Sequence, residues 1–157
     1  MAEWIVEQTD LYHPISQTLI HKLAHELASM YSEDEEVTNA YLNEMKPEER
    51  SVFLVVFDNH VPIGCGMIHA LHGETDTAEV KRMYVEPDYR SKGVGAVLLT
   101  ALEEQAESLG YVKMKLETGK IQYAAIRLYE KMGYTYCECY GRFATDPLSV
   151  CFHKPLA

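Results

Sequence analysis

The sequence predicts an α/β protein built on a mixed, mostly antiparallel twisted sheet of about six to seven strands, flanked by about four helices. Stretches rich in β-branched and aromatic residues alternate with stretches in which apolar residues recur at three- and four-residue spacing. Short turns between the early strands suit antiparallel hairpins, whereas a central helical stretch joins two strands as in a parallel β-α-β unit. With 157 residues, the chain is expected to form a single domain over residues 1–157.

The first part of the chain predicts one strand, two helices and a hairpin. Pro14 stands where a helix can begin, and an apolar stripe follows it as far as Tyr31. Pro47 ends the second helix, because the residue before a proline avoids helical backbone angles. In chain order we expect a strand at 4–9, helices at 14–31 and 36–45, and strands at 51–57 and 62–70.

The second part predicts strands separated by two helices. Pro87 closes the first of these strands, and Gly110 and Gly133 end the two helices, as glycine often does. In chain order we expect a strand at 78–85, a helix at 94–109, a strand at 111–116, a helix at 121–132, and strands at 134–140 and 149–152.

The charge balance limits the class of partner. There are 14 Lys and Arg residues against 24 Asp and Glu residues, which gives a net charge of −10 with His neutral. Nucleic acids and anionic membranes bind to basic surfaces, so we expect neither as a partner. A small ligand that carries phosphate is still allowed, because it needs only a local basic patch.

The cysteines and the N-terminus bear on the cellular location. Cys65, Cys137, Cys139 and Cys151 are too few and too irregularly spaced for a disulfide scaffold, so we expect free thiols in a reducing compartment. The apolar runs are much shorter than a membrane span, and no basic start followed by an apolar block marks a secretory signal. These features predict a cytoplasmic protein.

The segment 85–96 carries the clearest functional pattern: a strand ends, a turn follows, and a helix opens on two glycines. Gly93 and Gly95 allow the backbone to approach a ligand and to adopt angles that a side chain forbids. The N–H groups of a helix's first turn suit a phosphate. Leu98 stands where a dinucleotide-binding Gly-x-Gly-x-x-Gly motif needs its last glycine, so that fold is not supported. A glycine turn with surface charges is the alternative.

Two motifs resemble the GNAT superfamily of acyl-CoA-dependent N-acetyltransferases. The family signature (Arg/Gln)-x-x-Gly-x-(Gly/Ala) is matched by Arg90-Ser91-Lys92-Gly93-Val94-Gly95. A second hallmark, Ala-x-x-x-Tyr-x-x-x-Gly-(Phe/Tyr), is matched from Ala125 to Tyr134. Gln122 replaces the Asn often found three residues earlier and keeps an amide. The resemblance covers residues 50–155, with the preceding part fitting in outline, and implies the GNAT fold.

The resemblance implies direct attack of an amine on the thioester of acetyl-CoA, with acetyl-CoA as co-substrate and no metal. Tyr129 would act as general acid toward the departing thiolate, and Glu79 would act as general base, directly or through water. Backbone groups of residues 83–85 would line the pantetheine arm of the co-substrate. The residues implied in cofactor binding are Met83, Tyr84, Val85, Arg90, Ser91, Lys92, Gly93, Val94, Gly95, Ala96, Gln122 and Ala125.

Each catalytic assignment has an alternative that the residues leave open. Tyr129 lies on the apolar stripe of its helix and could serve only the core, and Glu79 could be a structural or substrate-binding carboxylate. A catalytically inactive CoA-binding module that senses or binds partners would carry the same motifs. So would an enzyme that uses another acyl-CoA donor.

The acceptor is expected to be a primary amine, on a small molecule or at a peptide N-terminus. Segment 33–50 holds seven acidic and two basic residues. In the family that the motifs resemble, the first two helices wall the acceptor site, so this segment would steer a cationic amine. The resemblance is also compatible with a homodimer. The identity of the amine stays open.

Overall fold

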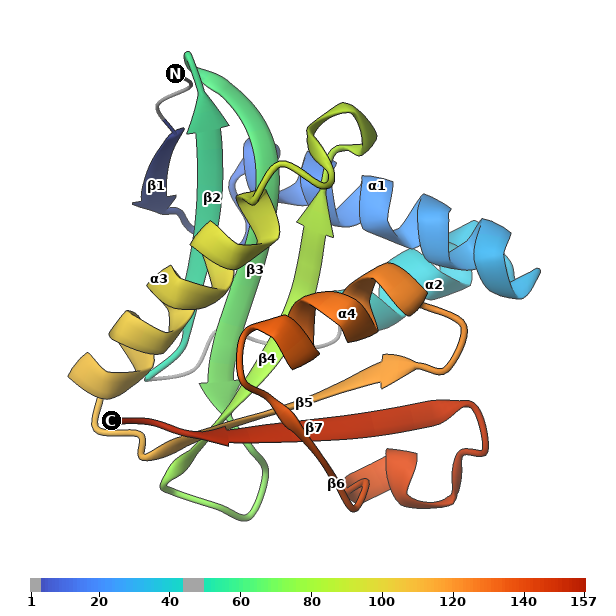
Figure 1. Cartoon of the computed structure of the whole chain (residues 1–157). Helices are drawn as coiled ribbons and strands as arrows, with labels where there is room; N and C mark the ends of the chain where they lie inside the picture. Colours follow the sequence, from blue (N-terminus) through green and yellow to red (C-terminus); the bar gives the residue numbers. More distant parts are fainter. Residues whose placement is uncertain (1–3, 44–49) are drawn as a thin grey trace.

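The computed structural model of the chain describes residues 4–43 and 50–157. Within them, seven strands form one sheet with the order β1-β2-β3-β4-β5-β7-β6 (Figure 1). The elements are β1 (Trp4–Gln8), α1 (Pro14–Tyr31), α2 (Glu35–Leu42), β2 (Val52–Asp58), β3 (Val61–Ala70), β4 (Thr77–Val85), α3 (Val94–Ser108), β5 (Lys113–Gly119), α4 (Tyr123–Lys131), β6 (Thr135–Cys137) and β7 (Ser149–Pro155), with 3-10 turns η1 (Pro87–Tyr89) and η2 (Gly141–Thr145).

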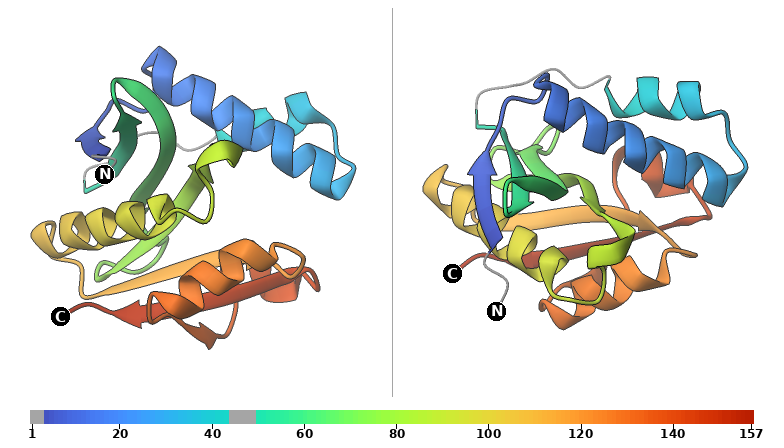
Figure 2. Two further views of the ribbon diagram at one scale, coloured as in Figure 1. Left: turned by 45° about the horizontal axis from the view of Figure 1, so that its top comes forward. Right: turned by 90° about the horizontal axis from the view of Figure 1, so that it is seen from above.

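The predicted fold class is confirmed, including the order of the elements. Strands β4 and β5 pair in parallel across helix α3, and all other neighbouring strands are antiparallel. Helices α1 and α2 lie on one face of the sheet, and α3 and α4 lie on the other (Figure 2). Within the described residues, no helix is both long enough and apolar enough to span a membrane.

Strand β2 illustrates how the sequence builds two cores. Val52, Leu54 and Val56 join the apolar cluster under α3 and α4, whereas Phe53 and Val55 join the cluster under α1. Side chains alternate between the faces of a strand, so a run that is apolar at every position packs on both sides. This is why the run of β-branched and aromatic residues predicts a central strand.

Several predicted boundaries differ from the structure by a few residues. The strand expected at 111–116 begins only at Lys113, because the N–H of Tyr111 closes the end of α3 by donating to the carbonyl of Ala106. It then continues to Gly119. The helix expected at 36–45 is Glu35–Leu42, and the end of the prediction lies outside the described residues.

The strand expected at 134–140 ends at Cys137, because contacts with distant parts of the chain determine the path of the residues that follow it. Cys139 forms a disulfide with Cys151 of β7, with 5.1 Å between the two Cα atoms. The prediction of free thiols is therefore wrong for these two cysteines and holds for Cys65 and Cys137. Disulfides are rare in reducing compartments, so the cysteines no longer support a cytoplasmic location.

A bulge in β4 determines where the sheet opens. The register between β3 and β4 shifts between Cys65 and Met67, so Gly66 faces both Arg82 and Met83. Arg82 adopts a φ of +56°, a left-handed angle that is uncommon outside glycine. A Cβ on Gly66 would lie 2.5 Å from the Met83 sulfur, so the bulge requires glycine opposite it. Bulges bend a strand and increase its twist.

Strands β4 and β5 part directly before this bulge. Their pairing is confined to residues 77–79 of β4 and 113–115 of β5. In Figure 1 the two strands start close together and then run in different directions. The second half of β4 and the second half of β5 are therefore not paired with each other, and we call this place the opening between β4 and β5.

Candidate active site

The opening between β4 and β5 exposes one backbone edge of β4. Met83, Tyr84 and Val85 lie on this part of the strand, beyond the last residue that pairs with β5. An unpaired strand edge can bind an extended chain through backbone hydrogen bonds. The amides of a pantetheine arm would fit such an edge, so the position of these three residues suits the role implied for them.

The loop after β4 leads from this edge to the start of α3. Gly93 is the N-cap residue of the helix and has a φ of +97°, which explains why glycine is needed there. The N–H groups in the first turn of a helix have no partner within the helix, so those of Val94 and Ala96 suit an anionic ligand. Gly95 serves a different purpose: a Cβ there would lie 2.8 Å from a methyl group of Leu128 on α4. It allows α3 and α4 to approach each other.

Arg90 is already engaged by protein groups in this structure. Its Nε donates to the carbonyl of Val85 at 2.8 Å, and its guanidinium also pairs with the Glu26 carboxylate of α1. Lys92 is exposed, with its ammonium 5.7 Å from the ring centre of Tyr89. To contact a phosphate, Arg90 would therefore have to exchange or share its carboxylate partner Glu26. Ser91, the residue between the two cations, is exposed and has a φ of +61°.

The start of α4 lies across the opening from α1. Gln122 is the N-cap residue of α4, and its Nε2 donates to the Tyr31 hydroxyl at 3.1 Å. Gly119 lies directly under this contact, because a Cβ there would overlap the Tyr31 hydroxyl. Ala125 is half-buried on the inner side of α4. The Gln122 amide is thus near the far end of β5, where a ligand in the opening would pass.

Tyr129 points from α4 into the core beside the opening. Its ring packs 5.9 Å from the ring of Tyr134 and 6.0 Å from that of Phe152, measured between centroids. Among the described residues, its hydroxyl has no hydrogen-bond partner. Burial raises the pKa of Tyr129, and the negative charge of Glu117 raises it further. The hydroxyl therefore keeps its proton at neutral pH, as a general acid must.

Glu79 lines a cavity of about 250 Å³ on the α2 side of the sheet, which we call the Glu79 cavity. Tyr140 donates its hydroxyl to Glu79 Oε2 at 3.0 Å, and the Lys81 ammonium lies 3.5 Å from the same oxygen. The cavity is lined by Tyr41, Leu42, His69, Leu71, His72, Glu79, Lys81, Arg82, Tyr140, Gly141, Arg142 and Phe143.

His69 faces the other oxygen of the same carboxylate. Its Nδ1 lies 2.8 Å from the carbonyl of Ala70, which can only accept, so Nδ1 carries a proton. Its Nε2 lies 3.1 Å from Glu79 Oε1. The two side chains therefore face each other inside the cavity.

The Glu79 carboxylate is ionised at neutral pH despite its burial. Burial would raise its pKa, but the hydrogen bond from His69, the charge of Lys81 and the hydrogen bond from Tyr140 outweigh that effect. The pKa of Glu79 is therefore lowered. An ionised carboxylate beside a cavity can accept a proton from a bound group.

A second carboxylate, Glu117, was missed by the sequence analysis. Glu117 lies on β5 just beyond the residues that pair with β4. Burial raises its pKa, although a hydrogen bond of 2.6 Å from the Ser149 hydroxyl opposes this effect. Its charge raises the pKa of Tyr140 and of Tyr129, and the charge of Glu79 raises the pKa of Glu117 in turn. The predicted strand stopped at Leu116, so the alternation that places Glu117 beside the opening was not followed far enough.

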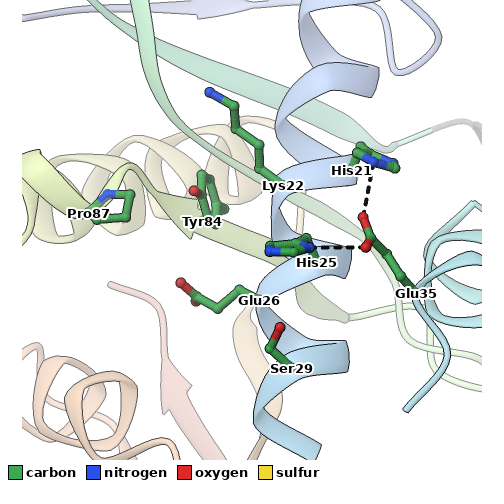
Figure 3. Close-up of a pocket in the computed structure, with 8 residues that line it drawn as sticks. All are labelled: His21, Lys22, His25, Glu26, Ser29, Glu35, Tyr84 and Pro87. Atoms are coloured by element: carbon green, nitrogen blue, oxygen red, sulfur yellow. Dashed lines mark hydrogen bonds and ion pairs between the residues drawn. The ribbon is translucent and has the colours of Figure 1, made fainter. Parts of the chain in front are cut away.

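A larger cavity of about 490 Å³ lies between α1 and the end of β4 (Figure 3). His21 and His25 both face Glu35 there, with nitrogen-to-oxygen distances of 3.1 and 3.0 Å. In the part of the chain that the structure describes, no group of three or more His, Cys, Asp or Glu side chains is arranged to hold a metal ion. This cavity also contains Lys22, Glu26, Ser29, Tyr84 and Pro87.

Comparison with known sequences matches this arrangement to one family. The model of the Acetyltransferase (GNAT) family matches residues 20–134, and the chain belongs to this family. The "IAA acetyltransferase" of Azospirillum brasilense is 34% identical over 152 residues, which cover 97% of each chain. Members of the family are acyl-CoA N-acyltransferases.

Solved structures agree with the GNAT fold. A putative acyl-CoA N-acyltransferase from Klebsiella pneumoniae superimposes with a TM-score of 0.83 at 27% identity, covering 98% of both chains. The PaiA N-acetyltransferase of Thermoplasma acidophilum, solved in complex with coenzyme A, has a TM-score of 0.74 at 17% identity, covering 98% of this chain and 99% of that one. The fold predicted from the two motifs is confirmed.

Glu79 and Glu117 are expected to affect the pH dependence of stability in opposite directions. Folding lowers the pKa of Glu79, so this side chain stabilises the fold at pH values above its ordinary pKa. That stabilisation is lost as pH falls through the pKa of the folded state. The pKa of Glu117 is raised, so stability falls as pH rises through that value. In urea unfolding followed over pH, Glu79→Gln should reduce the acid-side loss, and Glu117→Gln should reduce the decline toward neutral pH. Parallel curves for both variants and the native chain would contradict this.

Glu26→Gln should tighten the binding of CoA. The change releases Arg90 from a partly exposed ion pair, which is worth about 0.2–1 kcal/mol, so Kd should fall by about 1.5- to 5-fold. Calorimetric titration with CoA at low salt measures this, with Arg90→Gln expected to weaken binding. Glu36→Gln removes an exposed charge of the same sign from α2 and is the matched control. Equal effects of Glu26→Gln and Glu36→Gln would show that only net charge matters.

Proposed function

We propose that the protein transfers an acetyl group from acetyl-CoA to a primary amine by direct attack. The observation that carries the proposal is the opening between β4 and β5, with Glu79 near its closed end and Tyr129 beside it. Glu117 is electrostatically coupled to both groups, because its charge raises the pKa of Tyr129 and the charge of Glu79 raises the pKa of Glu117. A base and an acid thus flank one opening that suits a thioester.

Acetyl-CoA supplies the activated carbonyl, and the residues of the chain handle the protons. Glu79 accepts a proton from the amine, directly or through water, as the amine nitrogen forms its bond to the carbonyl carbon. A backbone N–H of residues 83–85 stabilises the developing oxyanion. Tyr129 donates its proton to the sulfur as the carbon–sulfur bond breaks, so that the products are an amide and free CoA. Proton exchange with solvent then restores both side chains.

The two protonation states support these roles. Glu79 has a lowered pKa and is ionised at neutral pH, whereas Tyr129 has a raised pKa and keeps its proton. Each group therefore begins the reaction in the state that its role requires. The first residues of α3 and the cations Arg90 and Lys92 would hold the phosphates of the co-substrate.

Tyr129→Phe should lower kcat by about 10²- to 10⁴-fold and leave the Kd of acetyl-CoA within about twofold. Free thiol released from acetyl-CoA in the presence of an amine panel measures turnover, and calorimetry measures Kd. Tyr134→Phe is the matched control, because its hydroxyl is bound to Glu103 and its ring packs against that of Tyr129. Tyr134→Phe should lower the free energy of unfolding but leave kcat unchanged. Strong acetyl-CoA binding without thiol release from any amine would instead support a sensing module.

Glu79→Gln should lower kcat/KM for the amine by about 10²-fold or more, with the larger share in kcat. Glu117→Gln is the comparison, because it removes a carboxylate from the other side of the same opening. If Glu79 is the base, Glu117→Gln keeps activity within about tenfold of the native chain. A larger loss in Glu117→Gln than in Glu79→Gln would assign the base to Glu117.

A further inference from the structure

The described walls of the Glu79 cavity hold more positive than negative charge. Lys81, Arg82 and Arg142 line it, and Glu79 is the one carboxylate among its described lining residues. His69 and His72 add groups that can become positive but not negative. A small cavity whose lining carries this excess of positive charge favours a ligand that carries a negative charge.

Two of the three cations are committed to protein groups. The Lys81 ammonium lies 3.5 Å from Glu79 and 4.9 Å from the ring centre of Phe143. Arg82 is buried in the bulge of β4, where its Nε donates to the carbonyl of Leu42. These contacts shape the cavity, and they leave Arg142 as the cation to consider for a ligand.

Arg142 is presented to the cavity by an aromatic platform. Its guanidinium carbon lies 4.0 Å from the ring centre of Tyr41 on α2 and 5.8 Å from that of Phe143. Within residues 4–43 and 50–157, no carboxylate forms an ion pair with it. A guanidinium held against an aromatic ring keeps its N–H groups in its own plane, where two of them match the oxygens of a carboxylate.

The hydrogen-bond donor to the base and this arginine belong to one short segment of chain. Tyr140 donates to Glu79, and Arg142 follows two residues later at the start of η2. In the right-hand view of Figure 2, η2 lies on the same side of the sheet as α2. The same turn therefore positions a group that contacts the base and a group that can hold an anion, around one cavity.

From these contacts we infer that the acceptor is a small α-amino acid, whose carboxylate binds Arg142 while its amine faces Glu79. The inference rests on the proposed function and specifies its substrate class. A cavity of about 250 Å³ is smaller than the usual range of drug-sized pockets, about 300–1,000 Å³, and suits a compact molecule. Tyr41 and Phe143 offer apolar surface to its side chain.

The acidic segment that led us to expect a cationic acceptor does not supply described carboxylates to this cavity. Glu35 faces His21 and His25 in the other cavity, and Glu33 accepts from the Thr38 hydroxyl at 3.4 Å. Glu44, Glu48 and Glu49, on which the expectation also rested, lie outside the described residues. An α-amino acid matches both charged groups of the cavity, because its amine faces Glu79 and its carboxylate binds Arg142.

The test compares matched sets of three amines with the same side chain: the α-amino acid, its amide, and the amine without the carboxylate. Small aliphatic, branched and aromatic sets are assayed for thiol release at saturating acetyl-CoA. In parallel, calorimetry measures their binding to the protein saturated with CoA, which does not depend on turnover. The native chain should favour the amino acid of at least one set by about 10- to 100-fold in kcat/KM and in Kd.

Arg142→Gln should remove this preference by weakening the amino acid by about 10- to 100-fold, mostly in KM, while the decarboxylated amine changes by less than about threefold. Arg142→Lys should restore it in part, because lysine keeps the charge but not the paired donors. Lys131→Gln removes an exposed cation from the last turn of α4 and is the matched control. Circular dichroism and unchanged Kd for CoA verify that the variants fold.

The outcomes separate the two proposals. If the amides or the simple amines give the same kcat/KM as the amino acids, the proposed function stands and the substrate class is wrong. Equal kcat/KM for the amides would indicate a peptide N-terminus as the acceptor. If amino acids bind through Arg142 without thiol release, the binding site stands and the proposed catalysis fails. If no amine binds or reacts, both fail. A preference for amino acids that survives Arg142→Gln overturns the role of Arg142.

Discussion

The early parting of β4 and β5 is the constraint on which the rest of the structure depends. Backbone N–H and C=O groups need partners, and a central strand normally finds them on both sides. Here the bulge at Arg82, opposite Gly66, turns β4 away once three residues have paired. In the proposed function, an extended, amide-containing ligand would occupy this freed edge.

This opening also sets the electrostatics of the site. Glu79 and Glu117 lie on the two strands that diverge, and both are largely buried, yet their pKa values shift in opposite directions. The difference comes from their partners: Glu79 has His69, Lys81 and Tyr140 beside it, whereas Glu117 has chiefly the Ser149 hydroxyl. Two neighbouring carboxylates whose pKa values shift in opposite directions, next to a protonated tyrosine, are typical of proton-transfer sites.

The sequence predicts those parts of the fold that depend on local pattern. The strand that became β2 has β-branched or aromatic residues at most positions, and Gly93 has a left-handed φ at the start of a helix, as glycine allows. The features that the sequence does not predict depend on contacts between residues far apart in the chain. Cys139 leaves its predicted strand to bond with Cys151, and Arg90 pairs with Glu26, 64 residues away. Neither contact leaves a periodic signal, and the packing of Arg142 on Tyr41 is of the same kind.

The charges show why position along the chain is a poor guide to position in space. Four basic residues between 81 and 92 suggest one patch. A strand advances roughly 3.3 Å per residue, so β4 carries Lys81 and Arg82 to the Glu79 cavity and leaves Arg90 and Lys92 at the other end. In the proposed reaction, an acetyl group passes from a phosphate-bearing donor to an amino acid, so the two substrates would need separate positive sites with a base and an acid between them. Strand β4 provides that separation, and the excess of acidic residues elsewhere keeps both sites local.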